Sequence, residues 1–402
     1  MHGVIEPVSR IAQRPGVAFL CLWSGVLNAT ATSPLSPALP SIAAELGGGV
    51  DGSFVAQMVQ SVSAIGMILG ATIAGYGSER FGRRAVMMAS ALLFIVAGMA
   101  GLVLANLTAL IVSRALTGLA SGAMLATSYA IAGENFVGDA RNRILGFCGG
   151  AGAFATLLLL GVAGYMVEGL GWRSVFSLYA LGFVILPVLL RSLHPGASVR
   201  TTRSGLGWGP ILRLWPLWLL QIGFSIGVFM SVVQVPFIAA SKGIVDAKTI
   251  SLLVATTSVS GTGIAIAYGF LRRFLDVRGM LSFIALAFGS GLLVCAFAAS
   301  LPMFLLGTMI LGFGAGSLEP TIISRAFQDT PEPLHDRAAG TSISTLFLGQ
   351  FLNPIAVYPM AATGGIGFAA ITFGCIYLLA AVPFLLPRGG GRFAFRDGSG
   401  SH

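Results

Sequence analysis

The chain has 402 residues, of which 55% are hydrophobic and only 9% are charged, and its mean hydropathy is +0.89. Soluble domains are about 25% charged because their surfaces must be hydrated, so this composition excludes a set of soluble domains. It predicts an all-α integral membrane protein that crosses the bilayer many times.

Twelve apolar runs are long enough to span a bilayer, which takes about 20 residues in a helix. In chain order they cover 17–43, 54–77, 85–106, 108–132, 144–167, 173–192, 210–240, 249–272, 279–300, 302–327, 338–361 and 364–387. A polar break with Pro195, Arg200 and Arg203 separates the first six runs from the last six. The sequence therefore predicts a six-helix bundle at 1–193, a cytoplasmic loop at 194–208, a six-helix bundle at 209–388 and a cytoplasmic tail at 389–402.

The basic residues predict the orientation of these spans. With the N-terminus placed in the cytoplasm, 19 of the 23 Lys and Arg residues fall in cytoplasmic segments, three fall outside, and Arg114 lies within a span. Such an excess of positive charge marks the cytoplasmic side. We expect a multi-pass protein of the inner membrane with both termini in the cytoplasm. The net charge of +9 follows from this topology, so it does not indicate a nucleic-acid partner.

The two predicted halves resemble each other at an offset of 194 residues. Gly118 and Gly122 in the fourth span correspond to Gly312 and Gly316 in the tenth. Duplicated six-helix halves with a substrate site between them at mid-membrane are a transporter architecture. The repeat therefore predicts two pseudo-symmetric bundles.

A polar stripe marks the first span, where Asn28, Thr32 and Ser36 recur every four residues. Such a stripe either lines a substrate path or bonds to a neighbouring helix, and helix packing is the commoner use. The same two interpretations apply to four amides of the seventh and eleventh spans, namely Gln221, Gln234, Gln350 and Asn353.

The loop after the second span is glycine-rich and basic. It contains Gly75, Glu79, Arg80, Gly82, Arg83 and Arg84 in the pattern G-x-x-x-E-R-x-G-R-R. This loop resembles the cytoplasmic loop between helices two and three of the major facilitator superfamily, which has the form G-x-x-x-D-R-x-G-R-R. The alternative interpretation is a loop that is merely positive because it is cytoplasmic.

The resemblance implies a secondary transporter with twelve helices in two six-helix bundles. It also implies that the loop is a cytoplasmic gate, in which the acid meets a helix N-terminus of the other half. The start of the eleventh span, near Gly340, is the candidate partner. The acid here is Glu79, which is one methylene longer than the aspartate of the family pattern.

Arg114 is an ionisable residue within the fourth span, and such residues are candidates for function. It begins the pattern R-x-x-x-G-x-x-x-G, which the superfamily also carries. Thr117 and Ser121 follow at helical spacing, so the three residues share a face that can line a cavity. The alternative is an arginine that extends to the outer membrane surface.

The fifth span departs from the antiporters of the superfamily. Their G-P-x-x-G-G pattern ends a few residues before G-W-R, which is present here as 171–173. Counting back places Leu159 and Leu160 where those antiporters have Gly-Pro. The resemblance therefore supports transport more strongly than antiport.

Glu319 is the one acid placed well inside a predicted span. It precedes Pro320, which we expect to interrupt the tenth span locally. Removal from water favours the neutral form of a carboxyl group, so a proton can be bound and released there. Glu319, with Arg114, is the candidate for proton coupling; the alternative is a neutral structural residue.

Signatures of enzymes are missing from the sequence. The four histidines lie in tails or loops, the four cysteines have no metal-ligand spacing, and there is no phosphate-binding loop. We expect no cofactor, no metal and no enzymatic activity. The predicted function is proton-coupled efflux of a small amphipathic organic molecule by a monomer in the lipid bilayer. The alternatives are an importer, as symporter or uniporter, and a membrane scaffold.

Overall fold

The computed structural model describes residues 11, 14–45, 49–104, 106–192, 207–331 and 334–385. The predicted tail at 389–402 and the predicted loop at 194–208, except for its last two residues, lie outside the described residues. Within these ranges the chain is helical and contains no strand. The prediction of an all-α fold is confirmed.

The described residues of the first half form seven α-helices. They are α1 (Pro15–Thr32), α2 (Leu39–Glu45), α3 (Gly49–Phe81), α4 (Arg83–Ala100), α5 (Leu107–Asn135), α6 (Gly138–Leu170) and α7 (Ile185–Ser192). Short 3₁₀ segments at Ser36–Ala38 and Trp172–Val184 precede α2 and α7.

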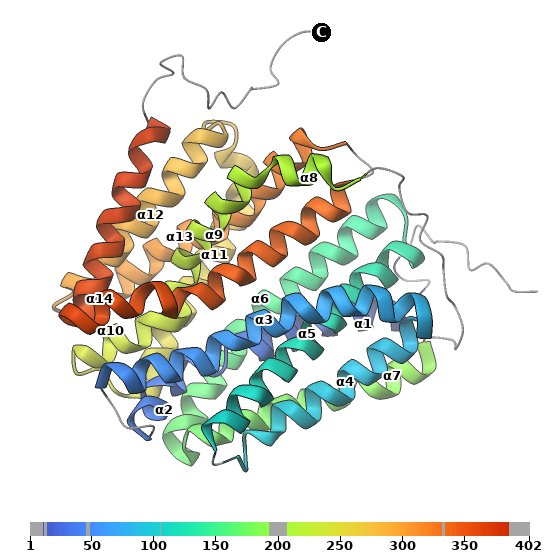
Figure 1. The fold of residues 1–402 in the computed structure, drawn as a ribbon, viewed down its shortest axis with the longest axis horizontal. Helices are drawn as coiled ribbons and strands as arrows, with labels where there is room; N and C mark the ends of the chain where they lie inside the picture. Colours follow the sequence, from blue (N-terminus) through green and yellow to red (C-terminus); the bar gives the residue numbers. More distant parts are fainter. Residues whose placement is uncertain are drawn as a thin grey trace, which may run out of the picture.

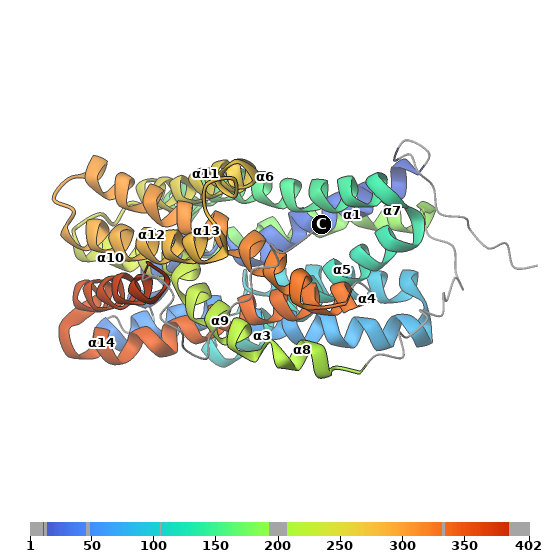
Figure 2. The ribbon, with the colours of Figure 1, turned by 90° about the horizontal axis from the view of Figure 1, so that it is seen from above.

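In the second half, the part that the structure describes forms another seven α-helices. They are α8 (Gly209–Arg213), α9 (Trp215–Phe229), α10 (Val235–Ser241), α11 (Ala247–Leu271), α12 (Val277–Phe297), α13 (Leu301–Asp329) and α14 (His335–Leu385). A π-helical turn at Met230–Gln234 joins α9 to α10. The two halves lie side by side as two bundles (Figures 1 and 2).

Eleven helices within the described residues are long and apolar enough to cross a membrane. One of them, Arg337–Leu385, has 49 residues, and a straight helix of that length would measure about 74 Å against a hydrocarbon core of about 30 Å. It is two helices joined at Gly365, whose φ of 79° lies in the left-handed region that favours glycine. Figure 1 shows the two arms of α14 running in different directions. The twelve predicted spans are therefore present.

Two prolines have effects that differ from the predictions. The first span breaks after Thr32, because Pro34 has no N–H to continue the helix, and Ser36 begins a 3₁₀ turn. The predicted polar stripe therefore ends at Thr32. The expected interruption at Pro320 is wrong, because α13 runs through this residue without a break. Neighbouring helices in a bundle make such prolines tolerable.

The glycine pairs related by the repeat bring helices together in both halves. A Cβ atom added to Gly118 would lie 2.0 Å from the Ser63 carbonyl oxygen, so α5 contacts the backbone of α3. A Cβ atom added to Gly316 would lie 1.9 Å from the Gly261 carbonyl oxygen, so α13 contacts α11 in the same way. Small residues let helix backbones approach closely in membranes. The repeat seen in the sequence is thus a repeat of helix packing.

Candidate functional site

Glu319 belongs to a polar cluster inside the second half. The Gln221 side chain of α9 donates from Nε2 to Glu319 Oε2 at 2.9 Å, and the Ser342 hydroxyl of α14 donates to Glu319 Oε1 at 2.9 Å. Thr345 Oγ1 donates to Gln221 Oε1 at 2.7 Å. Gln221 and Ser342 are fully buried, whereas Glu319 is half-buried. Three helices therefore converge on one carboxyl group.

This carboxyl group faces the first half of the molecule. Glu319 lies within electrostatic range of Tyr129 of α5, and Tyr129 lies near Cys148 of α6. Because α5 and α6 belong to the first bundle and α13 to the second, Glu319 lies where the two bundles meet. An acid in this place can sense the relative position of the halves.

Arg114 is held behind the first span. Its side chain is fully buried, with Nη2 donating to the Ala31 carbonyl oxygen at 2.6 Å and Nη1 donating to the Tyr179 hydroxyl. Ala31 lies just before the break of α1, and Gln60 of α3 donates to the neighbouring Thr32 carbonyl oxygen. The α1 carbonyls at the break thus accept from Arg114 and Gln60 in place of backbone donors.

The other polar residues predicted for the first half have separate surroundings. Asn28 and Ser121 are brought together, with Ser121 Oγ donating to Asn28 Oδ1 at 3.2 Å. Thr32 and Thr117 donate to carbonyls of their own helices. Ser36 donates to the Val232 carbonyl oxygen in the π-helical turn at 2.5 Å, so it links the two halves.

Three amides form a chain between the halves. Gln234 Nε2 donates to Gln57 Oε1 of α3 at 2.9 Å and to Asn353 Oδ1 of α14 at 2.7 Å. Asn353 Nδ2 in turn donates to the Ile226 carbonyl oxygen at 2.9 Å. Gln350 lies apart from this chain, fully buried, and neither atom of its carboxamide has a partner among the described residues.

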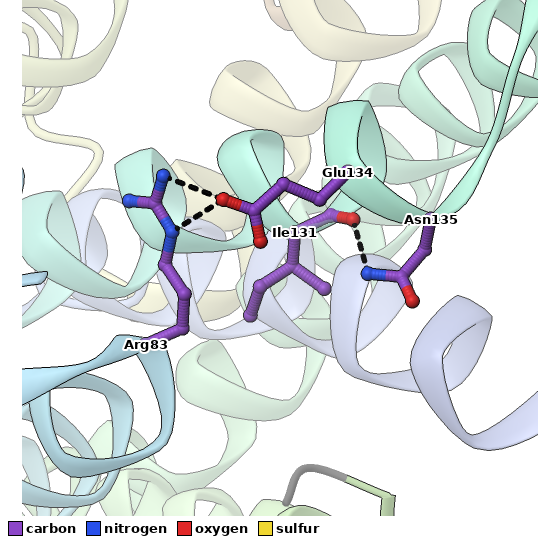
Figure 3. Close-up of polar contacts among 4 residues, drawn as sticks. All are labelled: Arg83, Ile131, Glu134 and Asn135. Atoms are coloured by element: carbon purple, nitrogen blue, oxygen red, sulfur yellow. Dashed lines mark hydrogen bonds and ion pairs between the residues drawn. The ribbon is translucent and has the colours of Figure 1, made fainter. Parts of the chain in front are cut away.

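The predicted gate loop lies between α3 and α4. Glu79 and Arg80 are exposed at the end of α3, and Gly82 turns the chain with a φ of 84°. Arg83 pairs with Glu134 of α5, in the same half, with Nη2 and Oε1 at 2.8 Å; Figure 3 shows this ion pair beside Asn135. The pair ties the loop to its own bundle, and a contact between Glu79 and the start of the eleventh span stays a prediction.

The two ends of the molecule differ. We call the end that holds α2 and α10 the α2 end, and the end that holds α8 the α8 end (Figure 1). At the α2 end, α3 and α14 are joined by a hydrogen bond of 2.7 Å from the Tyr358 hydroxyl to Asp51, and the rings of Phe54 and Tyr358 are 4.6 Å apart. Toward the α8 end, Cβ atoms added to Gly75 of α3 or Gly340 of α14 would meet open space.

The second pair of helices that joins the halves, α6 and α11, shows the same difference. Near the α2 end, a Cβ atom added to Gly164 would lie 2.4 Å from Ser251 Oγ and 3.0 Å from the Ala247 carbonyl oxygen. Toward the α8 end, Cβ atoms added to Gly146 or Gly269 would meet open space. The halves are thus packed closely at the α2 end, whereas these four glycines toward the α8 end have no close neighbour.

Comparison with known proteins identifies the family. The family model described as Major Facilitator Superfamily matches residues 21–271. The chain belongs to the major facilitator superfamily. The predicted family is therefore confirmed, and the chain is a membrane transporter and not an enzyme.

Relatives of this transporter differ in how much of their length they share with it. A 3-(3-hydroxy-phenyl)propionate transporter of Escherichia coli (strain K12) is 23% identical over 371 residues, which cover 84% of this chain and 87% of the relative. An uncharacterized MFS-type transporter of Mycobacterium tuberculosis (strain ATCC 25618 / H37Rv) is 33% identical over 178 residues. Those residues are 43% of this chain and 24% of the relative, so the match spans about a quarter of that relative's length.

Solved structures share the fold of this transporter. A D-xylose-proton symporter has a TM-score of 0.74 at 16% identity, covering 92% of this chain and 97% of the other. An inward open xylose transporter from E. coli has a TM-score of 0.70 at 15% identity, covering 94% and 97%. At such low identity the likeness concerns the fold alone.

Sequence reasoning missed several partners in this transporter. Gln57 and Gln60 are polar residues three positions apart in the second span, a signal that was available. Ser342 and Thr345 are also three apart, but small hydroxyl residues are common in membrane helices and carry little signal. The sequence carried no signal for Tyr179, because a tyrosine in a predicted span is typical of the membrane interface.

An ion pair joins the halves of the transporter at the α2 end and can be tested by charge reversal. Lys248 Nζ of α11 lies 3.1 Å from Glu168 Oε1 of α6, and both side chains are more than two-fifths exposed. Exposed pairs contribute about 0–1 kcal/mol, so either reversal, Glu168→Lys or Lys248→Glu, should lower the closed population of this end up to about fivefold. The double reversal should restore it.

The measurement is the distance between spin labels at Leu170→Cys and Val245→Cys, two exposed positions at the α2 end, with exposed Cys375 changed to serine. The single reversals should lengthen this distance, and high salt should reduce their effect. Equal distances in all four proteins would show that the pair does not hold the end closed.

Proposed function

We propose that this transporter couples the movement of a small amphipathic organic molecule to protons, and that Glu319 carries the proton. The observation behind this is the set of hydrogen bonds at Glu319. The Ser342 hydroxyl can donate to a carboxylate or accept from a protonated carboxyl, and the Gln221 amide can donate to either form. The cluster therefore keeps its hydrogen bonds in both protonation states.

The charges near the Glu319 cluster support a neutral or cationic substrate. Arg114 is fully buried, and the two terminal nitrogens of its guanidinium group donate to Tyr179 and Ala31, so its hydrogen bonds hold the first span. The polar groups beside Glu319 are uncharged amides and hydroxyls. We assign to Arg114 the positioning of the first span. Arg114 then contributes to coupling only through the shape of the proposed transport site.

We infer efflux as the direction of transport. By the positive-inside rule the α8 end faces the cytoplasm, so the closely packed α2 end faces the outside. A substrate would then enter from the cytoplasm and leave when the halves rock about the central site. A Bacillus subtilis multidrug transporter protein is 27% identical over 165 residues, covering 39% of this chain and 28% of the relative.

Proton symport of an aromatic acid is the second candidate. Its support is the E. coli 3-(3-hydroxy-phenyl)propionate transporter and a putative niacin/nicotinamide transporter of B. subtilis, which is 23% identical over 352 residues covering 82% of this chain. Both matches extend over most of the two chains. The partners of Glu319 argue against this candidate, because Gln221 and Ser342 are uncharged and neither supplies a positive charge for a carboxylate.

Transport by proteoliposomes under an imposed pH gradient tests the proposal. One pH unit corresponds to about 1.36 kcal/mol, so exchange of one proton per substrate can drive about tenfold accumulation. With ethidium, nicotinamide and 4-hydroxybenzoate as probes, antiport predicts uptake into vesicles with an acidic interior. Symport predicts uptake when the external medium is acidic.

Glu319→Gln is the decisive variant. We expect it to abolish the roughly tenfold gradient-driven accumulation while substrate counterflow continues, because the amide keeps the shape of the site but binds no exchangeable proton. Glu45→Gln is the matched control, since Glu45 pairs with Arg173 at 2.8 Å at the α2 end, away from the cluster. Accumulation by Glu319→Gln equal to that of the unmodified protein would refute the assignment.

A further inference from the structure

A pocket lies between the two halves at the α2 end, apart from the Glu319 cluster. It has a volume of about 320 Å³, at the lower limit of pockets that bind small molecules. Its walls include residues of α3, α10 and α14, among them Phe54, Gln57, Phe237, Ser241, Tyr358 and Ala361. Neither the amide chain nor the proposed proton site accounts for this space.

The walls of the α2-end pocket suit an aromatic ring. Phe54 and Tyr358 lie on opposite halves with their ring centroids 4.6 Å apart at an angle of 49°, and Phe237 adds a third ring. Aromatic rings favour offset or tilted contacts with other rings at this range of distances. All the lining residues are uncharged, so the pocket favours a neutral ligand.

The polar side of the pocket is the Gln57 carboxamide. Gln57 is only 5% exposed, and its Oε1 atom accepts the hydrogen bond from Gln234 at 2.9 Å. This leaves the NH₂ group of Gln57 as the donor that a ligand in the pocket can meet. A carbonyl oxygen on the ligand is the matching acceptor.

The pocket depends on the arrangement of the halves. Its walls come from α3 on one side and from α10 and α14 on the other, so separation of the halves at the α2 end would divide it. A ligand that binds one of two conformations stabilises that conformation by its differential affinity. Occupancy of this pocket must therefore favour the closed α2 end.

We propose that the α2-end pocket is a second ligand site, which takes a small neutral molecule with one aromatic ring and a carbonyl group. Its occupancy holds the α2 end closed and slows the transport cycle without competing for the central site. This inference rests on the pocket alone and holds for either direction of transport and with or without proton coupling.

Benzamide is the probe for this site, and cyclohexanecarboxamide, which lacks the aromatic ring, is its matched control. Thermal unfolding of the full chain in lipid nanodiscs should shift upward with benzamide in a saturable way, because a ligand that binds the native state stabilises it. Cyclohexanecarboxamide should give a smaller shift. No saturable shift with benzamide would overturn the proposal.

A pair of neighbouring variants locates the site. Ala361→Trp fills the pocket and should weaken benzamide binding at least tenfold, whereas Ala362→Trp places the same side chain at an exposed position that does not line it. If Ala361→Trp does not fold, Gln57→Leu replaces it, because it removes the donor while keeping a similar volume. Equal binding by the pocket variant and the control would overturn the proposal.

The conformational effect has its own readout. Benzamide should shorten the distance between spin labels at Leu170→Cys and Val245→Cys in a protein whose α2 end has been weakened by Glu168→Lys. Benzamide should also lower the maximal transport rate while leaving the substrate KM unchanged. A change in KM alone would show competition at the central site and would contradict the inference.

Discussion

Replacement of Arg114 by methionine is expected to destabilise the transporter by on the order of 2–6 kcal/mol, because two buried polar groups lose their donor at about 1–3 kcal/mol each. These groups are the Ala31 carbonyl oxygen and the Tyr179 hydroxyl, and the Arg114 side chain between them is fully buried. The Ala31 carbonyl lies at the break of α1, where the helix stops after Thr32 and no residue continues its backbone hydrogen bonds. Loss of the Arg114 hydrogen bond should therefore make the backbone more mobile where α1 ends.

Two further variants separate the contributions. Tyr179→Phe removes one hydrogen bond but keeps the ring that packs 5.4 Å from the Arg114 guanidinium carbon, so it should cost about 1 kcal/mol. Arg114→Lys keeps the charge, but lysine lacks the planar fork that reaches both acceptors. Its loss of stability should therefore lie between those of Tyr179→Phe and Arg114→Met. Thermal unfolding in nanodiscs measures the order of stability of these three variants. An Arg114→Met protein as stable as the unmodified one would contradict the positioning role.

Replacement of Gly164 by leucine is expected to open the α2 end. Its Cβ atom would fall 2.4 Å from Ser251 Oγ and 3.0 Å from the Ala247 carbonyl oxygen, so α6 and α11 must move apart. Overpacking costs about 1–3 kcal/mol, which lowers the ratio of the closed to the open state by about 5- to 150-fold. Gly164→Ala should produce a smaller effect in the same direction.

Gly161→Leu is the matched control, because a Cβ atom there would meet open space one helical turn earlier on α6. Spin labels at Leu170→Cys and Val245→Cys report the separation of α6 and α11. The label distance should lengthen in Gly164→Leu and remain unchanged in Gly161→Leu. An unchanged distance in both variants would mean that this close contact does not determine the state of the α2 end.

These two predictions concern different parts of the transport cycle. Arg114 lies within the first half and positions the broken first span, so its loss should affect every conformation. Gly164 lies at the contact between the halves, so its replacement should change the balance between conformations while each half keeps its fold. The thermal and distance measurements therefore distinguish a weakened bundle from a shifted equilibrium.

The amino-acid sequence determined the membrane class, the twelve spans and the division into halves. Each of these properties depends on local composition, because a helix must carry about 20 apolar residues to cross the hydrocarbon core. The repeated glycine pairs were also visible, since Gly118 and Gly312 stand in equivalent spans. Their function in close packing follows from residue size alone.

Tertiary structure decided which predicted residues lie together. Glu319 was recognisable as an acid inside a span, but its partners Gln221 and Ser342 come from two other helices. Arg114 was expected on a cavity-lining face, yet the end of α1 and Tyr179 cover it. Helical periodicity shows which residues share a face, but the helix that covers that face is set by the packing of the whole bundle.

The two prolines show the same limit of prediction from sequence. Pro34 and Pro320 each lack the N–H that continues a helix, but α1 breaks at the first and α13 continues through the second. Where α1 ends before Pro34, Arg114 and Gln60 donate to the Ala31 and Thr32 carbonyl oxygens. The sequence by itself determined where backbone donors are missing, whereas only the tertiary structure decided the outcome, because the replacement donors come from distant parts of the chain.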